Sequence, residues 1–132
     1  MSRQNVDIAR RAYELADREG TAVALQLLAP DFELDMSSLY PDAPVIRGID
    51  NLLRWTDGGP WGGSTRLQAE RFFDVDDERV LVFIRGTATG EGSGVPVEIR
   101  DAHELTIRDG LIVRCKVHRD QDAALEAVGL SE

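Results

Sequence analysis

The sequence predicts a single α+β domain in which helices cover one face of a curved antiparallel sheet. Apolar residues recur at helical spacing through the first part of the chain, and the pattern changes to strands from Arg66 onward. In that second part, four segments rich in β-branched and aromatic residues are separated by short runs of Gly, Asp and Glu, which is typical of successive hairpins. A chain of 132 residues fits one domain, so we assign residues 1–132 to it.

Three helices and one short strand are predicted before Arg66. The first helix covers residues 3–18, whose apolar positions form one broad face. A second, short helix runs from its N-cap at Thr21 through Leu28 and is stopped by Pro30. Phe32 to Met36 alternates apolar and acidic residues and is therefore predicted to be a strand.

Proline and glycine mark the ends of the remaining elements. The segment from Ser37 to Ile46 holds two prolines and is expected to be a loop, whereas Gly48 opens the third helix, which ends in a Gly-rich stretch. A short helix closes the chain, with Asp120 as its N-cap and Gly129 at its end. The four strands are predicted at Arg66 to Val75, Arg79 to Thr89, Val95 to Ile107 and Leu111 to Arg119.

The turn of the last hairpin decides which polar side chains face the helices. If Asp109 and Gly110 form a two-residue turn, His103 shares its face with the basic residues of the last strand. If Arg108 belongs to a three-residue loop with Gly110 in the left-handed conformation, His103 lies opposite Cys115. Odd-numbered side chains are apolar on both strands, and only the three-residue loop places both apolar sets on one face, so we predict that loop.

This register predicts a mostly apolar inner face with a few polar members. Asp101, His103 and Arg119 are those members, and Asp101 and Arg119 are diagonal neighbours placed to pair. The pair is interpreted either as a site for the polar head of a ligand or as a structural ion pair. The opposite face receives Glu98, Arg100, Glu104, Arg114, Lys116 and His118.

Composition excludes several functions. With 15 basic and 24 acidic side chains the net charge is −9, so binding to nucleic acid or to an anionic membrane surface is not expected. No apolar run approaches the roughly 20 residues that span a bilayer, and the N-terminus lacks an apolar signal core, so we expect a cytoplasmic protein. Cys115 is the single cysteine and differs from His118 in strand parity, so no disulfide, metal site or cofactor is expected.

Five segments in this order resemble the nuclear-transport-factor-2-like superfamily and, within it, the SnoaL-like proteins. The resemblance implies a cone-shaped curved sheet packed against three N-terminal helices, with a short C-terminal helix, and it implies a homodimer. The fold hosts isomerases, epoxide hydrolases, cyclases and binding proteins, so it does not specify an activity. The matching segments are Asn5 to Glu14, Leu27 to Glu33, Ile46 to Asp50, Thr106 to Val113 and Asp122 to Leu130.

The resemblance to ketosteroid isomerases implies three catalytic positions. These enzymes use a first-helix tyrosine and a later acid as an oxyanion hole, with a first-strand aspartate as the base. Tyr13 is placed like the tyrosine and Asp35 like the base, whereas His103 stands where the second acid is expected. A neutral His103 side chain can still donate one hydrogen bond to a developing enolate.

Two other activities of the superfamily fit the sequence less well. A resemblance to the epoxide hydrolases of this fold would imply a carboxylate-arginine-carboxylate arrangement on neighbouring strands. Arg79 matches the arginine, but its strand lacks an acid, and Val117 stands where the second acid is expected. A resemblance to the SnoaL-like cyclases would also imply an acid near the position of Val117. Val117 is instead a candidate for lining the pocket. Trp55 and Trp61 are placed to close the pocket or, alternatively, to cover the edge of the core.

The leading hypothesis is a SnoaL-like protein with an apolar pocket that binds a small hydrophobic molecule. In that hypothesis proton transfer or isomerisation uses Asp35 as the base and Tyr13 and His103 as hydrogen-bond donors. The alternative is a non-catalytic dimeric domain whose cavity is filled by side chains and whose outer sheet face binds itself or a partner.

Overall fold

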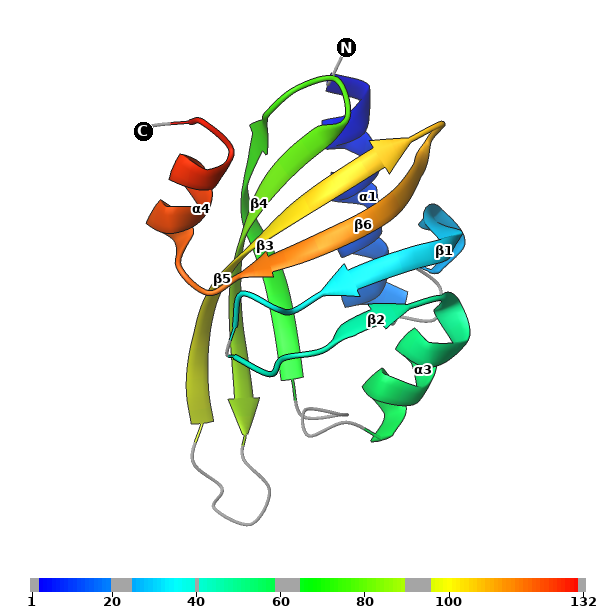
Figure 1. The fold of residues 1–132 in the computed structure, drawn as a ribbon, viewed down its shortest axis with the longest axis vertical. Coiled ribbons are helices and arrows are strands. Elements are labelled where there is room, and N and C mark those ends of the chain that lie inside the picture. Colours follow the sequence, from blue (N-terminus) through cyan, green and yellow to red (C-terminus); the bar gives the residue numbers. More distant parts are fainter. Residues whose placement is uncertain (1–2, 20–24, 40, 59–64, 90–95, 131–132) are drawn as a thin grey trace.

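One six-stranded sheet forms the body of the molecule (Figure 1). The computed structural model describes residues 3–19, 25–39, 41–58, 65–89 and 96–130. The elements are α1 (Arg3–Glu19), the 3₁₀ turn η1 (Leu25–Leu27), β1 (Leu28–Asp35), β2 (Val45–Arg47), α3 (Ile49–Gly58), β3 (Thr65–Asp74), β4 (Arg79–Thr89), β5 (Pro96–Arg108), β6 (Leu111–His118) and α4 (Gln121–Ala127).

The strand order is β2-β1-β6-β5-β4-β3. All neighbouring strands are antiparallel except β1 and β6, which lie side by side in parallel, cyan beside orange in Figure 1. The sheet is therefore mixed, and the prediction of an antiparallel sheet is wrong at this pair. Parallel neighbours are joined by a long crossover rather than a hairpin, so turn residues carry no signal for them.

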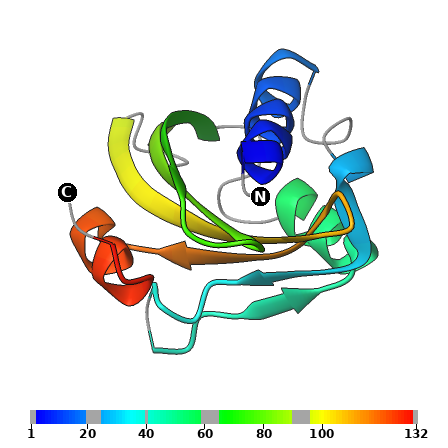
Figure 2. The same cartoon turned by 90° about the horizontal axis from the view of Figure 1, so that it is seen from above.

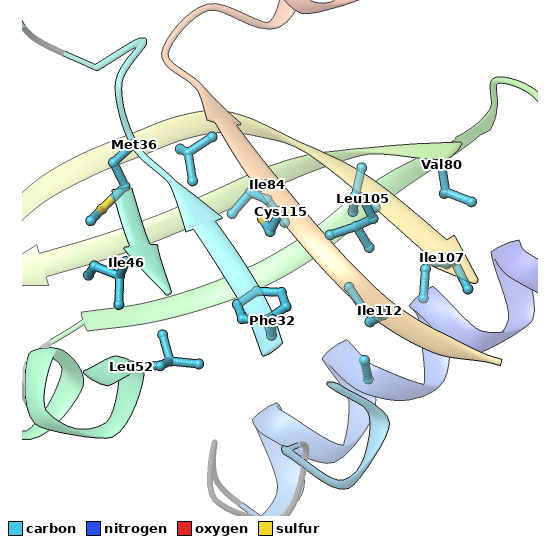
Figure 3. Close-up of a cluster of buried hydrophobic side chains, with 14 residues drawn as sticks. Phe32, Met36, Ile46, Leu52, Val80, Ile84, Leu105, Ile107, Ile112 and Cys115 are labelled. Carbon is cyan, nitrogen blue, oxygen red and sulfur yellow. The ribbon is translucent and has the colours of Figure 1, made fainter. Parts of the chain in front are cut away.

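The helices lie on opposite sides of the curved sheet. Figure 2 shows α1 over the concave face, with α4 on the other side. The concave side holds the larger core, in which Val80, Val82 and Ile84 from β4 are fully shielded from solvent. Figure 3 shows how side chains from β1, β2, β4, β5, β6 and α3 meet there. A second cluster packs Leu125 of α4 against the convex face.

The helices that precede the sheet differ from the prediction. Only α1 is long; residues 25–27 form a single 3₁₀ turn, and the rest of the second predicted helix lies outside the described residues. Strand β1 already begins at Leu28 and contains Pro30, because its pairing with β6 is irregular between Leu28 and Glu33 and so tolerates a residue without an N–H group. The end of the expected loop forms β2, which extends the sheet beside β1.

The last hairpin has the two-residue turn that the prediction rejected. Asp109 (φ 52°) and Gly110 (φ 80°) both have positive φ, as a tight hairpin turn requires, and Arg108 faces Leu111. A register shift follows, because Ile107 pairs with Ile112 but Thr106 pairs with Arg114. This bulge changes the parity as a three-residue loop would.

Beyond the bulge the predicted faces of β5 and β6 hold. Next to the turn they do not, because Ile112 rather than Leu111 or Val113 lies in the concave core, and the predicted partner of His103 is also wrong. His103 pairs with Val117 instead of Cys115, two residues further along β6 and on the same face.

The remaining elements agree with the sequence. The strands β3 to β6 lie within a residue or two of their predicted bounds, and α3 follows Gly48. At α4 the Asp120 side chain accepts a hydrogen bond from the Ala123 backbone N–H at 3.1 Å, which confirms the N-cap. None of the helices in the described part of the chain is long and apolar enough to cross a membrane.

Candidate ligand site on the inner face

A hydrogen bond between Tyr13 and His103 joins α1 to the centre of the sheet. The hydroxyl oxygen of Tyr13 and Nδ1 of His103 are 2.6 Å apart, and the ring centroids are separated by 5.8 Å. Both side chains are half-buried. The first-helix Tyr13 and the inner-face His103, both predicted as site residues, thus meet each other across the interior.

Burial determines the protonation of this pair. It lowers the pKa of His103 to about 4, with a further contribution from the charge of His118 on the other side of the sheet. Burial also raises the pKa of Tyr13 well above its ordinary value, helped by Cys115. At neutral pH His103 is therefore neutral, and in the tautomer that carries its proton on Nε2 the Tyr13 hydroxyl donates to Nδ1. The ring proton is then on Nε2, for which no described residue is a hydrogen-bond partner.

Asp101 lies two residues from His103 on the same face of β5. Asp101 pairs with Ile84 and His103 with Val82, and both of these β4 residues lie in the concave core. Burial raises the pKa of the Asp101 carboxyl group. Among the described contacts this carboxylate has no hydrogen bond or ion pair, and Arg119 is exposed just beyond β6, so the expected Asp101–Arg119 pair is not observed.

Apolar groups surround these polar side chains. Val117 lies opposite His103 and is buried in the concave core, and Cys115 lies two residues earlier on β6. Burial raises the pKa of the Cys115 thiol to about 12, so the thiol is neutral and packs as an apolar group. Phe72 meets Tyr13 edge to face, with ring centroids 6.2 Å apart.

Asp35 lies on the other face of the sheet. It pairs with Lys116, whereas its neighbour Leu34 pairs with Cys115 on the inner face. Its carboxylate accepts bonds from the Ser37 backbone N–H at 2.9 Å, the Ser37 hydroxyl at 2.6 Å and the Arg114 guanidinium at 2.5 Å. Burial raises its pKa, but the Ser37 bonds and the Arg114 charge outweigh this and hold the pKa low. The structure therefore does not bring Asp35 together with Tyr13 and His103.

The predicted roles of the two tryptophans fall outside the described residues. Trp55 belongs to α3, and its side chain, like all of Trp61, lies outside the described part of the structure.

A polar network on the convex face was not foreseen from the sequence. His118 Nε2 lies 2.9 Å from Glu104 Oε1, and Arg79 reaches the same carboxylate at 3.4 Å. Strand parity places these residues on one face, but parity does not show which charges pair. Within the described ranges no group of three His, Cys, Asp or Glu side chains has the spacing to hold a metal ion.

Two of the cavities bordered by described residues adjoin α1. One of about 560 Å³ lies at the N-terminal end of α1, where it is lined mainly by polar groups of the turns after β3 and β5. The other, of about 260 Å³, is a groove between α1 and β3. Tyr13 lines the groove, which therefore reaches the side chain that binds His103.

A profile of the SnoaL-like domain matches residues 9–115. The chain belongs to the SnoaL-like domain family. No curated protein sequence matches this SnoaL-like chain.

Solved structures share the fold of this SnoaL-like protein. TerC, co-crystallised with polyporic acid, has a TM-score of 0.74 and 21% identity over 95% of this chain and 98% of its own. An NTF2-like protein of unknown function from Burkholderia pseudomallei has a TM-score of 0.73 and 22% identity, covering 96% and 98%. A ketosteroid isomerase-like protein from Kribbella flavida has a TM-score of 0.71 and 19% identity, covering 91% and 80%.

Proposed function

We propose that this SnoaL-like protein binds a small, largely apolar molecule on the inner face, with a carbonyl or enolate oxygen of the ligand on His103 Nε2–H. The observation that carries the proposal is the Tyr13–His103 hydrogen bond on an otherwise apolar wall. In the tautomer in which Tyr13 donates to Nδ1, the ring presents its Nε2–H as a donor of fixed direction. TerC, a structural neighbour, was crystallised with a small molecule, which supports a ligand-binding role for this fold.

Proton transfer is the chemistry that we propose for this site, with Asp101 in place of Asp35 as the base. Asp101 lies roughly 7 Å along the strand from His103, since a strand rises about 3.4 Å per residue. It shares the inner face, and burial raises its pKa toward neutrality, which makes it a better proton acceptor. A proton removed beside a carbonyl would pass to Asp101 while His103 stabilises the oxygen that gains negative charge.

A matched pair of neutral ligands tests the binding role. Acetonaphthone carries a carbonyl group, and ethylnaphthalene has nearly the same shape without a hydrogen-bond acceptor. We expect the wild-type protein to bind the ketone about 3–10-fold more tightly, because one net hydrogen bond is worth about 0.5–1.5 kcal/mol. In His103→Asn the amide oxygen still accepts from Tyr13, but Nε2 is absent, so this preference should disappear.

Two results would contradict the proposal. Equal binding of ketone and hydrocarbon by the wild type would remove the role of His103 as donor. Failure of both ligands to bind would favour the alternative, a non-catalytic domain that is filled by its own side chains and forms a homodimer through its outer sheet face. Sedimentation of the purified protein then measures that dimer.

A further inference from the structure

The inner face of β5 changes from closed to open along its length. Leu105 and Ile107, toward the end of the strand, are buried in the concave core. Toward its start, Ile99 is half-buried, and Val97 is 49% exposed. His103 lies between these two parts, so a molecule bound to His103 meets a closed wall in one direction along the strand and an open one in the other.

Ile99 and Val97 continue the face that carries Asp101 and His103. The pairing of β5 with β4 has no register shift between Val97 and His103, and alternate side chains of a strand share a face. A single exposed valine is ordinary on a protein surface. This valine, however, lies in line with the two polar groups of the proposed site.

The neighbouring strands give this part of β5 few side chains to pack against. On one side Ile99 pairs with Gly86 of β4, which has no side chain. On the other side β6 is absent, because it pairs with β5 only from Ala102 onward, and β5 runs on beyond it (Figure 1). Neither of the two core clusters includes Ile99 or Val97. These two side chains, which we call the β5 row, are therefore apolar groups that the described core does not use.

The polar atoms next to the β5 row are open to their surroundings. Among the described residues, no buried side-chain nitrogen or oxygen atom lacks a hydrogen-bond partner. Nε2 of His103 and the carboxylate of Asp101 have no such partner, so neither is sealed inside the protein. Together with the exposure of Val97, this indicates that the site opens along the first half of β5.

We propose that the ligand of this protein is elongated, with its carbonyl group at one end on His103 and an apolar chain along the β5 row. A rise of about 3.4 Å per residue places Val97 roughly 20 Å from His103 along the strand, so only a long chain reaches it. The carbon next to the carbonyl group then lies toward Asp101, the proposed base. This proposal rests on the proposed function above, because it names the shape of the molecule that the same site takes.

Two isomeric ketones test the orientation. Methyl nonyl ketone carries its carbonyl group near one end, whereas dipentyl ketone has the same atoms with the carbonyl group in the middle. Because Leu105 and Ile107 close the wall beyond His103, dipentyl ketone can lay only one of its chains along the β5 row. We expect the wild type to bind methyl nonyl ketone about tenfold more tightly by titration calorimetry, since it buries more apolar surface there.

A row variant tests the two apolar side chains themselves. Val97→Thr with Ile99→Thr removes apolar surface but keeps the branched shape that strands favour. It should bind methyl nonyl ketone about fivefold more weakly. Methyl pentyl ketone is too short to reach Val97, so its affinity should stay within about twofold of the wild-type value, which also shows that the variant is folded.

Val75→Thr is the matched control, because Val75 is a half-buried valine that packs against the convex-face cluster. It should bind both ketones as the wild type does. Methyl ¹³C NMR then locates the chain directly. The Val97 methyl signals should shift when methyl nonyl ketone saturates the wild type and should stay in place with methyl pentyl ketone.

The outcomes separate the two proposals. Equal affinities for the two isomers, equal effects of the row variant and the control, or shifts at Phe72 in the groove between α1 and β3 with Val97 unmoved would each overturn the elongated ligand. In each of these cases the binding role stands if His103→Asn weakens the binding of methyl pentyl ketone. Failure of all the ketones to bind would overturn the binding role, and the elongated ligand with it.

Discussion

Acidification from neutral pH should destabilise the folded protein through His103. The pKa of this histidine is about 4 in the folded protein and ordinarily 6.5, because burial disfavours the imidazolium. As the pH falls below 6.5 the unfolded chain takes up a proton that the folded chain does not, so the free energy of unfolding decreases. A difference of one between the two pKa values is worth about 1.4 kcal/mol. The difference of about 2.5 therefore corresponds to a loss of about 3 kcal/mol in the free energy of unfolding.

His103→Asn is the matched control for this effect. The amide oxygen of asparagine occupies the position of Nδ1, so it keeps the hydrogen bond from Tyr13 but does not titrate. The pKa values of Asp35, Asp76 and Glu104 are also lowered by their partners, and these carboxylates lose stabilising bonds as the pH falls toward their folded pKa values. That loss occurs in both proteins and cancels in the difference between them.

Urea unfolding followed by intrinsic tryptophan fluorescence gives the required free energies. Between about pH 7 and about pH 4.5 the wild type should lose about 2–3 kcal/mol more than His103→Asn. Parallel stability curves for the two proteins, with a difference below about 0.5 kcal/mol over this range, would refute a neutral, buried His103.

Three further predictions concern the core and the last turn. Cys115 should resist a disulfide reagent at about pH 8 in the native protein and react on unfolding, because burial raises its thiol pKa to about 12. Ile84→Ala should cost about 2–5 kcal/mol by urea unfolding, since Ile84 is 0% exposed, whereas Val97→Ala, at 49% exposure, should cost under about 0.5 kcal/mol. Gly110→Ala should cost about 1–2 kcal/mol of stability through its φ of 80° alone, and Gly110→Asn should cost less. Fast reaction of Cys115 in the native protein would contradict the first prediction. Equal losses of stability in Ile84→Ala and Val97→Ala would contradict the second, and unchanged stability of Gly110→Ala would contradict the third.

The strand faces were predictable from the sequence, but their partners were not. Alternation placed His103, Cys115 and Val117 on one face because strand side chains repeat every two residues. The pairing depended on a two-residue turn followed by a bulge. Beyond the bulge this combination places side chains on the same faces as a three-residue loop without a bulge, so a pattern of period two does not distinguish them. For this reason the faces beyond the bulge were right although the turn was wrong.

The composition of the site was only partly predictable. Tyr13 and His103 are 90 residues apart, and their contact depends on how α1 lies across the sheet, which local patterns do not encode. Asp35 was misplaced relative to this pair because its strand joins the sheet through the parallel β1–β6 contact, for which no turn gives a signal. Asp101, predicted only as a ligand contact, shares the inner face because β4 and β5 pair without a register shift around it.

The ¹⁵N NMR spectrum of the His103 ring tests the central claim most directly. At about pH 7 we expect a neutral ring with its proton on Nε2 and an unprotonated Nδ1 that accepts from Tyr13, and Tyr13→Phe should shift the Nδ1 signal. Saturating acetonaphthone should then shift the Nε2 signal, whereas ethylnaphthalene should leave it nearly in place. A protonated ring at this pH, or an Nε2 signal that does not respond to bound ketone, would contradict a ligand site built on Tyr13 and His103.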